Sequence, residues 1–342
     1  MKLNLVRFDF WIDDIFEAEI AKDPLINLIR CKQSDLDIVN MEHFRTAHIY
    51  HILAARDEVP KQWHVTEQLL ETCKDLICVS SSGAGYDPVD VQACTSRGVL
   101  VINQAGGNAD SVAEHAIGLM LDVKHRISES DRLMRAGKTT SREELMGNQL
   151  RGLTLGLIGI GETGRRTALL AKAFGMRVLA FDPYFSQEEI HSRGAEPCRF
   201  QDLIPQADII SVHCPRNSDT LNLFNATTFN QAKSGATFIS TARGGIHNED
   251  DLYVAIKSGK IGGAGLDVWA VEPPPKDHPL LSLPNVVSTF HTAGVTHEAR
   301  FNSAKMGAEQ IRSFVKGQRP TRIVNPQVWP IVELKLKKIL AQ

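Results

Sequence analysis

The sequence has no surplus of positive charge and no long apolar run. Its 342 residues include 38 Lys and Arg against 40 Asp and Glu, which gives a formal net charge of -2. A protein that binds nucleic acid through its phosphates needs a basic surplus, so this balance argues against that class. No stretch approaches the roughly 18 consecutive apolar residues of a membrane-spanning helix. Acidic residues enter the first segment, MKLNLVRFDFWIDD, before a signal-peptide core could form. We therefore expect a soluble, cytoplasmic protein without a membrane or nucleic-acid partner.

Cysteine is scarce as well. The six cysteines are scattered and form no CxxC pair, and no Cys/His cluster has zinc-ligand spacing. Three of them, Cys73, Cys78 and Cys94, fall in apolar stretches, where a free thiol packs as a small hydrophobic group. We expect reduced cysteines and no metal site.

The length suggests two domains. In the first hundred residues, short strand-like runs alternate with helix-like runs, which is typical of a parallel sheet covered by helices. The expected strands are 48–54, 76–80 and 99–102, and the expected helices are 66–73 and 89–98.

The alternation is interrupted at NQAGGNAD (103–110), where two adjacent glycines suggest a domain crossing. Ser111 and Glu114 have the spacing of a capping box and predict the start of a helix. From 151 a stronger alternation begins, with a second capping box at Ser186 and Glu189. Its six expected strands, the number of a doubly wound dinucleotide domain, are 153–160, 177–182, 207–214, 235–242, 264–269 and 285–291.

The chain becomes helical again after 296, and this segment is expected to return to the first domain. We predict an α/β protein with one domain formed by 1–106 and 296–342, and a Rossmann-type domain formed by 107–295.

A glycine-rich turn marks the predicted nucleotide site. Residues Gly159-Ile160-Gly161-Glu162-Thr163-Gly164 form G-x-G-x-x-G between a buried strand and a helix. In this motif Gly159 allows the tight turn, and Gly161 lets the pyrophosphate approach the backbone. Gly164 lets the helix pack closely on the strand. Asp182 ends the next strand, where a carboxylate accepts the ribose hydroxyls and repels a 2′-phosphate. The pattern predicts NAD rather than NADP.

Three polar residues lie beyond the ends of late strands, where parallel sheets gather their ligands. They are Arg243, Glu272 and His291. Taken singly, each has an ordinary interpretation: a surface ion-pair partner, a solvated loop acid and a core imidazole, respectively.

Together with their flanking residues, they resemble the NAD-dependent D-isomer-specific 2-hydroxyacid dehydrogenase family. The resemblance extends from about 80 to 295, and the first 75 residues match only in general pattern. It rests on SSGAGYD (81–87), SVAEHA (111–116), LGLIGIGETGRR (155–166), HCPRNSDT (213–220), STARGG (240–245), GAGLDVWAVEPPP (263–275) and STFHTAG (288–294).

The resemblance implies a flavodoxin-like substrate domain and a catalytic trio. Arg243 would hold the substrate carboxylate and polarise the 2-oxo oxygen, His291 would be the general acid-base, and Glu272 would raise the histidine pKa. The substrate residues that it implies are Gly83, Ala84, Gly85 and Asn108, with the N–H groups around Ala84 and Gly85 binding the carboxylate.

The resemblance also implies further cofactor contacts, including one from Asp267 to the nicotinamide amide. The others are Ile160, Glu162, Thr163, His213, Cys214, Pro215, Thr220, Thr241 and Ala242. Phe290 replaces the proline usual before the histidine, and Glu162 occupies a position that is often basic or neutral.

The predicted function is the NAD-dependent interconversion of a small 2-keto acid and its D-2-hydroxy acid. Three alternatives stay open: a 3-phosphoglycerate dehydrogenase, with Arg45, Arg56 and Lys61 as candidate phosphate ligands; an NAD-binding corepressor-like scaffold; and a formate or phosphite dehydrogenase. Because the sequence ends soon after the core, we expect no regulatory domain of the kind found in some phosphoglycerate dehydrogenases. By analogy with the family we expect a homodimer formed through the region 111–146.

Overall fold

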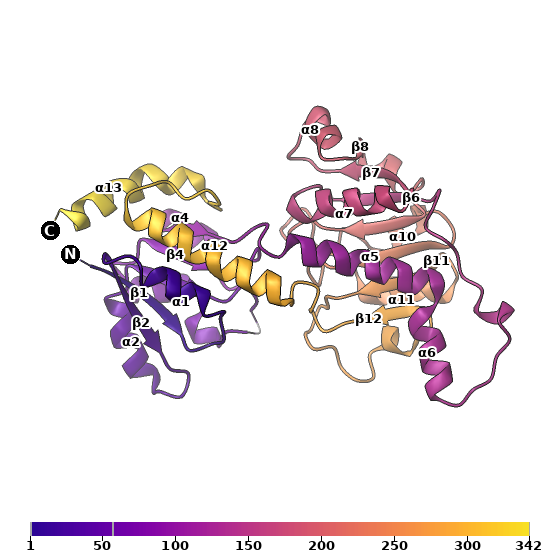
Figure 1. The fold of residues 1–342 in the computed structure, drawn as a ribbon, viewed down its shortest axis with the longest axis horizontal. Helices are drawn as coiled ribbons and strands as arrows, with labels where there is room; N and C mark the ends of the chain where they lie inside the picture. Colours follow the sequence, from indigo (N-terminus) through magenta and orange to yellow (C-terminus); the bar gives the residue numbers. More distant parts are fainter. Residues whose placement is uncertain (1, 57, 342) are drawn as a thin grey trace. The chain divides into compact units, whose positions relative to one another are not determined.

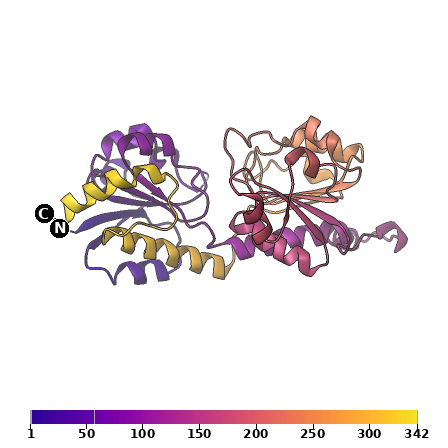
Figure 2. The same cartoon turned by 90° about the horizontal axis from the view of Figure 1, so that it is seen from above.

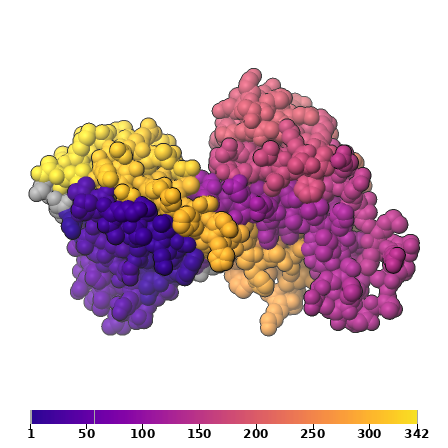
Figure 3. All heavy atoms as spheres, viewed as in Figure 1, coloured from indigo at the N-terminus to yellow at the C-terminus, as the bar shows by residue number. Residues whose placement is uncertain are grey.

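A computed structural model describes residues 2–56 and 58–341. The chain forms two compact units, one made of Met1–Asn108 with Thr296–Gln342 and the other of Ala109–Val295. Within the first unit, the late segment (yellow) packs directly on the early one (indigo), as Figure 3 shows.

The first unit is built on a five-stranded parallel sheet with the strand order β2-β1-β3-β4-β5. This is the flavodoxin-like order, so the predicted fold class of this unit is confirmed. Its elements are β1 (Leu3–Phe8), α1 (Ile15–Ile20), β2 (Ile26–Cys31), α2 (Asp37–Arg45), β3 (Ile49–Ile52), η1 (Lys61–Trp63), α3 (Glu67–Thr72), β4 (Cys78–Ser81), α4 (Val91–Arg97), β5 (Leu100–Ile102), α12 (His297–Val315), η4 (Pro326–Val328) and α13 (Trp329–Leu340).

Helices cover both faces of this sheet, as Figure 2 shows from above. On one face, α2, α3 and α4 bury residues such as Phe44, Leu69 and Cys94 against the strands. On the other face, α1 and α12 bury residues such as Phe16 and Phe314. Because both faces are covered, apolar side chains predominate in the strands, although β1 to β4 also contain polar residues.

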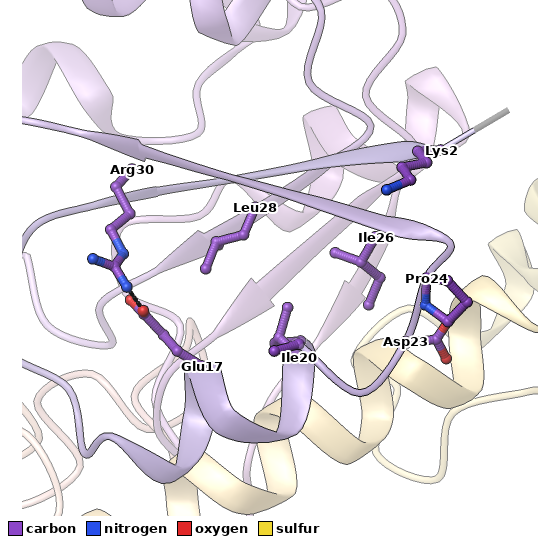
Figure 4. Close-up of a pocket in the computed structure, with 9 residues that line it drawn as sticks. Lys2, Glu17, Ile20, Asp23, Pro24, Ile26, Leu28 and Arg30 are labelled. Atoms are coloured by element: carbon purple, nitrogen blue, oxygen red, sulfur yellow. Dashed lines mark ion pairs between the residues drawn. The ribbon is translucent and has the colours of Figure 1, made fainter.

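An open hollow lies over the edge strand of this sheet, between α1 and β2 (Figure 4). Its floor includes Ile20, Ile26 and Leu28, and the ion pair of Arg30 with Glu17 lies on one side. Strands β1 and β3 separate β2 from β4, which leads into the predicted substrate loop. The hollow is therefore a feature of the sheet edge, separate from that loop.

The second unit contains a seven-stranded parallel sheet with the order β12-β11-β10-β9-β6-β7-β8. Strand order reverses beside β6, as in a Rossmann fold, so the predicted fold class is confirmed here too. Its elements are α5 (Ala109–His125), α6 (Ile127–Arg135), η2 (Glu143–Leu145), β6 (Thr154–Ile158), α7 (Glu162–Ala173), β7 (Arg177–Phe181), α8 (Gln187–Ser192), β8 (Glu196–Pro197), α9 (Phe200–Leu203), β9 (Ile209–Val212), α10 (Ala226–Gln231), β10 (Ala236–Ser240), α11 (Glu249–Lys257), β11 (Ile261–Leu266), η3 (Pro279–Ser282) and β12 (Val286–Ser288).

This sheet also has an apolar core on each face. Phe224, Phe229 and Phe238 form one core with residues of α11. Ala116 and Met120 of α5 contribute to the other, together with residues of α7. The covered faces leave the loops at the carboxyl ends of the strands as the sites available to ligands.

Several local predictions need correction. The Ser111–Glu114 box does not begin its helix, because α5 starts at Ala109. Ala109 is fully buried, and Asp110 provides the negative charge that favours a first helical turn. The expected strand 285–291 pairs only over Val286–Ser288, after which the chain turns away. By contrast, the predicted capping box of Ser186 and Glu189 is confirmed.

All six cysteines are free thiols. Among residues 2–56 and 58–341, no group of His, Cys, Asp and Glu is arranged to hold a metal ion. Within the same residues, no helix is both long and apolar enough to cross a membrane.

Candidate active site

His291 lies in a loop just beyond β12 and has an unusual backbone conformation. Its φ is 54°, in the left-handed region that few residues other than glycine adopt. Its N–H donates to the carbonyl of Asp267 at 2.8 Å. A strained backbone that neighbouring bonds hold in place is typical of a functional position.

The buried carboxylate of Asp267 fixes this loop. Asp267 is 0% exposed, and it accepts bonds from the Thr289 hydroxyl at 2.6 Å, the Thr292 N–H at 2.8 Å and the Ala293 N–H at 2.9 Å. The family resemblance assigned Asp267 to the nicotinamide, and without it the residue could equally have been a capping acid at the strand end. We infer that Asp267 orients the histidine loop; its nicotinamide contact stays a prediction.

His291 and Glu272 form a hydrogen-bonded pair. The imidazole Nδ1 lies 2.8 Å from Glu272 Oε2, and the Trp269 N–H donates to Glu272 Oε1 at 2.9 Å. Each oxygen of the carboxylate thus has a partner that fixes its orientation. An Nδ1–H that donates to Glu272 leaves Nε2 as the ring atom available for proton transfer.

The pair also has shifted pKa values. Burial lowers the pKa of His291, but the hydrogen bond and negative charge of Glu272 outweigh it, so the pKa lies above its ordinary value. Burial raises the pKa of Glu272, but the bonds from His291 and the Trp269 N–H reverse this and leave the pKa lowered. The geometry therefore holds an ionised carboxylate beside an imidazole that accepts a proton readily.

Arg243 belongs to the same electrostatic neighbourhood. It lies just beyond β10, and its Nη1 donates to the carbonyl of Ala242 at 2.7 Å. Its positive charge acts to lower the pKa of both Glu272 and His291. The three side chains thus follow β10, β11 and β12, which are neighbours in the sheet, two of them labelled in Figure 1.

We expect Glu272→Gln to shift the pH dependence of the reaction. The side-chain amide oxygen of the variant could still accept the Nδ1–H bond, but the amide lacks the charge that stabilises the imidazolium, so the pKa of His291 should fall. The alkaline limb of the kcat/KM profile for the keto-acid reduction that the resemblance implies should therefore move to lower pH. The control is Glu196→Gln, an exposed acid paired with Arg177. An unchanged profile in Glu272→Gln would contradict the assignment.

The glycine turn after β6 has the geometry that a dinucleotide requires. Gly159 has φ +97°, and a Cβ there would lie 2.9 Å from the backbone of His213 and Cys214. A Cβ on Gly164 would lie 2.2 Å from the carbonyl oxygen of Gly159, whereas a Cβ on Gly161 would meet nothing within 4 Å. The tight contacts fix the turn, and the open space over Gly161 lets a pyrophosphate approach the first N–H groups of α7.

Asp182 is tied to this turn. Its Oδ2 accepts the N–H of Ile160 at 2.9 Å, and its Oδ1 accepts the N–H of Tyr184 at 3.0 Å. A carboxylate retains further lone pairs after these bonds, so it can also accept ribose hydroxyls. The turn and the acid together fit an adenine dinucleotide.

Glu162, the departure noted at the start of α7, does not carry an isolated charge. Its Oε2 pairs with Arg165 at 2.8 Å and with Arg166 at 2.9 Å. Burial raises the pKa of Glu162, but the two guanidinium groups outweigh this and lower it. The ionised acid is therefore neutralised locally, which reduces its repulsion of a bound pyrophosphate.

The remaining predicted cofactor residues occupy carboxyl-end loops. His213, Cys214, Pro215 and Thr220 follow β9, and the Thr220 hydroxyl donates to the Pro215 carbonyl at 2.7 Å. Burial lowers the pKa of His213 to about 4, which keeps it neutral. Thr241 and Ala242 follow β10. The cofactor contacts of these residues stay predictions.

The predicted substrate residues lie in the first unit. Gly83, Ala84 and Gly85 form the loop that follows β4, and Asn108 is the last residue before α5. Among the described residues, the N–H groups of Gly83, Ala84 and Gly85 have no hydrogen-bond acceptor. The loop therefore offers free backbone donors to an anion.

Comparison with known proteins places the chain in a family. Residues 117–293 match the NAD-binding domain of the D-isomer specific 2-hydroxyacid dehydrogenases. The chain belongs to this family, as its sequence motifs predicted. The match also confirms NAD as the predicted cofactor of the second unit.

Its relatives carry different names. It is 41% identical to a D-3-phosphoglycerate dehydrogenase of Archaeoglobus fulgidus over 80% of this chain and 53% of that protein. It is 34% identical to a glyoxylate reductase of Korarchaeum cryptofilum over 77% of this chain and 80% of that protein. The chain spans about half the length of the phosphoglycerate dehydrogenases that it matches.

Solved structures show the same fold. A D-lactate dehydrogenase of Aquifex aeolicus, in complex with NAD and lactic acid, superimposes with a TM-score of 0.80 and 26% identity. The match covers 94% of this chain and 99% of that chain.

Proposed function

We propose that this chain interconverts a small 2-keto acid and its D-2-hydroxy acid, with NAD as the redox cofactor. The observation that carries the proposal is the His291–Glu272 pair, at 2.8 Å, beside Arg243 in an NAD-binding domain of this family. This reaction requires a proton donor, a carboxylate that stabilises the protonated donor, and a guanidinium.

In the reducing direction, the substrate's carboxylate pairs with the planar guanidinium of Arg243, which also polarises the 2-oxo group. When bound, NADH supplies the hydride that adds to the 2-oxo carbon. His291 donates its Nε2 proton to the carbonyl oxygen as the C=O bond becomes a C–O–H bond. Glu272 keeps its bond to Nδ1 throughout and stabilises the imidazolium before the transfer. The neutral imidazole then regains a proton from water.

An activity panel tests the proposal. NADH consumption would be followed with glyoxylate, hydroxypyruvate, pyruvate and 3-phosphohydroxypyruvate, and NAD reduction with formate and phosphite. We expect turnover with at least one 2-keto acid. Binding of NADH without turnover on the whole panel would favour the scaffold alternative, and turnover of formate or phosphite alone would favour that dehydrogenase class.

A phosphorylated substrate is the second candidate, and the names of the relatives that are 41% and 37% identical support it. The candidate phosphate ligands Arg45, Arg56 and Lys61 are all exposed in the first unit. A kcat/KM for 3-phosphohydroxypyruvate well above that for hydroxypyruvate would support this candidate, and the reverse order would reject it.

We also propose that the chain forms a homodimer through the region 111–146. No residue of α6 is buried, and Met134 and Met146 are 77% and 71% exposed. Exposed apolar side chains of this kind are common at protein interfaces. Light scattering coupled to size exclusion should give twice the mass of the chain.

We expect Asp182→Asn to weaken NADH binding about tenfold or more, because a hydrogen bond to a charged acceptor is lost. The neutral amide no longer repels a 2′-phosphate, so the affinity for NADPH should rise relative to that for NADH. Fluorescence titration with both dinucleotides measures this, and the control is Asp202→Asn, a half-exposed acid paired with Arg199. An unchanged preference would remove Asp182 from ribose recognition.

A further inference from the structure

In the loop of Gly83, Ala84 and Gly85, every carbonyl group accepts a hydrogen bond from a neighbouring residue of the same unit. The carbonyl of Gly83 accepts the Gln104 N–H at 2.8 Å, and that of Ala84 accepts Nδ2 of Asn103 at 2.8 Å. The third carbonyl, of Gly85, accepts the hydroxyl of Ser81. All three carbonyls therefore point toward the interior of the unit.

These anchors determine where the loop N–H groups point. In a planar trans peptide, the C=O of one residue and the N–H of the next point in opposite directions. Anchoring the Gly83 carbonyl inward therefore aims the Ala84 N–H outward, and anchoring the Ala84 carbonyl aims the Gly85 N–H outward. The family resemblance assigns these two N–H groups to the substrate carboxylate, and neither has an acceptor among the described residues.

The anchoring segment is itself fixed by a residue far away in the sequence. Nε2 of Gln310, on α12, donates to the carbonyl of Asn103 at 2.8 Å and to Oε1 of Gln104 at 2.7 Å. Its Oε1 accepts the Arg322 N–H at 3.0 Å. Gln104 is fully buried, and its Nε2 donates to the Ser81 carbonyl at 3.0 Å.

The geometry points to Asn103 and Gln310 as positioning residues of the substrate loop. Asn103 orients the Ala84–Gly85 peptide directly, through its bond to the Ala84 carbonyl. Gln310 fixes the 103–104 segment in the position from which Asn103 makes this bond. Neither side chain is proposed to touch substrate. The two residues set the affinity for the substrate carboxylate through the direction of the loop N–H groups. This inference rests on the proposed function for the identity of the anion.

The first test is kinetic. We expect Asn103→Ala and Gln310→Leu to raise KM for the keto acid about tenfold, because a misaligned pair of donors binds the carboxylate less well. The value of kcat at saturation and the Kd for NADH should change little. Asn103→Asp should be worse than Asn103→Ala, because a carboxylate beside the Ala84 carbonyl favours the flipped peptide.

Asn325→Ala is the matched control. Asn325 is a buried amide in the same unit that accepts the Val101 N–H at 2.8 Å and donates to the Val99 carbonyl at 2.9 Å. It supports β5 and makes no bond to the loop of Gly83, Ala84 and Gly85. We expect Asn325→Ala to lower the melting temperature at unchanged KM. An equal KM increase in this control, or none in Asn103→Ala and Gln310→Leu, would overturn the inference.

Amide hydrogen exchange separates this inference from the proposed function. The Gln104 N–H, bonded to the Gly83 carbonyl, should exchange faster in Asn103→Ala and Gln310→Leu than in the unmodified protein or in Asn325→Ala. If the unmodified protein turns over no keto acid, the proposed function fails. Faster exchange would then still support the loop positioning, and unchanged exchange would overturn it.

Discussion

Replacing His291 with asparagine should lower kcat for keto-acid reduction by about 10²- to 10⁴-fold, the usual contribution of a general acid-base group. Asparagine is the appropriate substitution because the residue has φ 54°, and asparagine tolerates the left-handed region better than alanine. An amide fills part of the imidazole's space but cannot transfer a proton at neutral pH. The Kd for NADH, measured by fluorescence titration, should stay within a few-fold of the unmodified value.

The matched control is His278→Asn. His278 also forms a partly buried pair with a glutamate, its Nε2 lying 3.1 Å from Glu249 Oε2. This pair is not assigned to the reaction, so its loss should leave most of the turnover. A His291→Asn protein that binds NADH and retains full activity would remove the histidine from the mechanism.

Arg243→Lys should lower kcat/KM for the keto acid by about 10²- to 10³-fold, comparable to the removal of a preorganised donor at a developing oxyanion. Lysine keeps the positive charge but lacks the planar guanidinium that pairs with a carboxylate through two parallel bonds. The Kd for NADH should be nearly unchanged. Steady-state kinetics over a range of keto-acid concentrations would show the loss.

A second substitution separates the charge of Arg243 from its geometry. The positive charge acts to lower the pKa of His291, so Arg243→Met should let that pKa rise. The alkaline limb of residual reduction should then move to higher pH, opposite to Glu272→Gln. The exposed Arg199→Lys is the control. If Arg243→Lys has the kinetics of the unmodified protein, the guanidinium does not bind substrate.

Much of the second unit follows from local sequence signals. The near-continuous apolar run before Gly159 predicted a buried strand, and Gly159 itself has the positive φ that the turn requires. The strands of the first 47 residues were not predicted. In β2, the edge strand INLIRC, the polar residues Asn27 and Arg30 weaken the apolar signal that a central strand has.

The candidate site was predictable as far as its residues lie at strand ends. Arg243, Glu272 and His291 come together because β10, β11 and β12 are adjacent, an arrangement that the strand order implies. The supports of the site were not predictable. No local pattern links Asn103 to Gln310, because their contact depends on how α12 returns to the first sheet.

The return of the chain to the first unit has a consequence for biosynthesis. Ile311 and Phe314 of α12 complete the apolar core that Leu5 and Phe16 begin. During translation, the early strands therefore leave the ribosome before α12, which covers one face of their sheet, has been synthesised. All of Ala109–Val295 is synthesised in between. The unit of Ala109–Val295 can fold first. The early segment of the first unit must avoid aggregation until α12 and α13 have been synthesised.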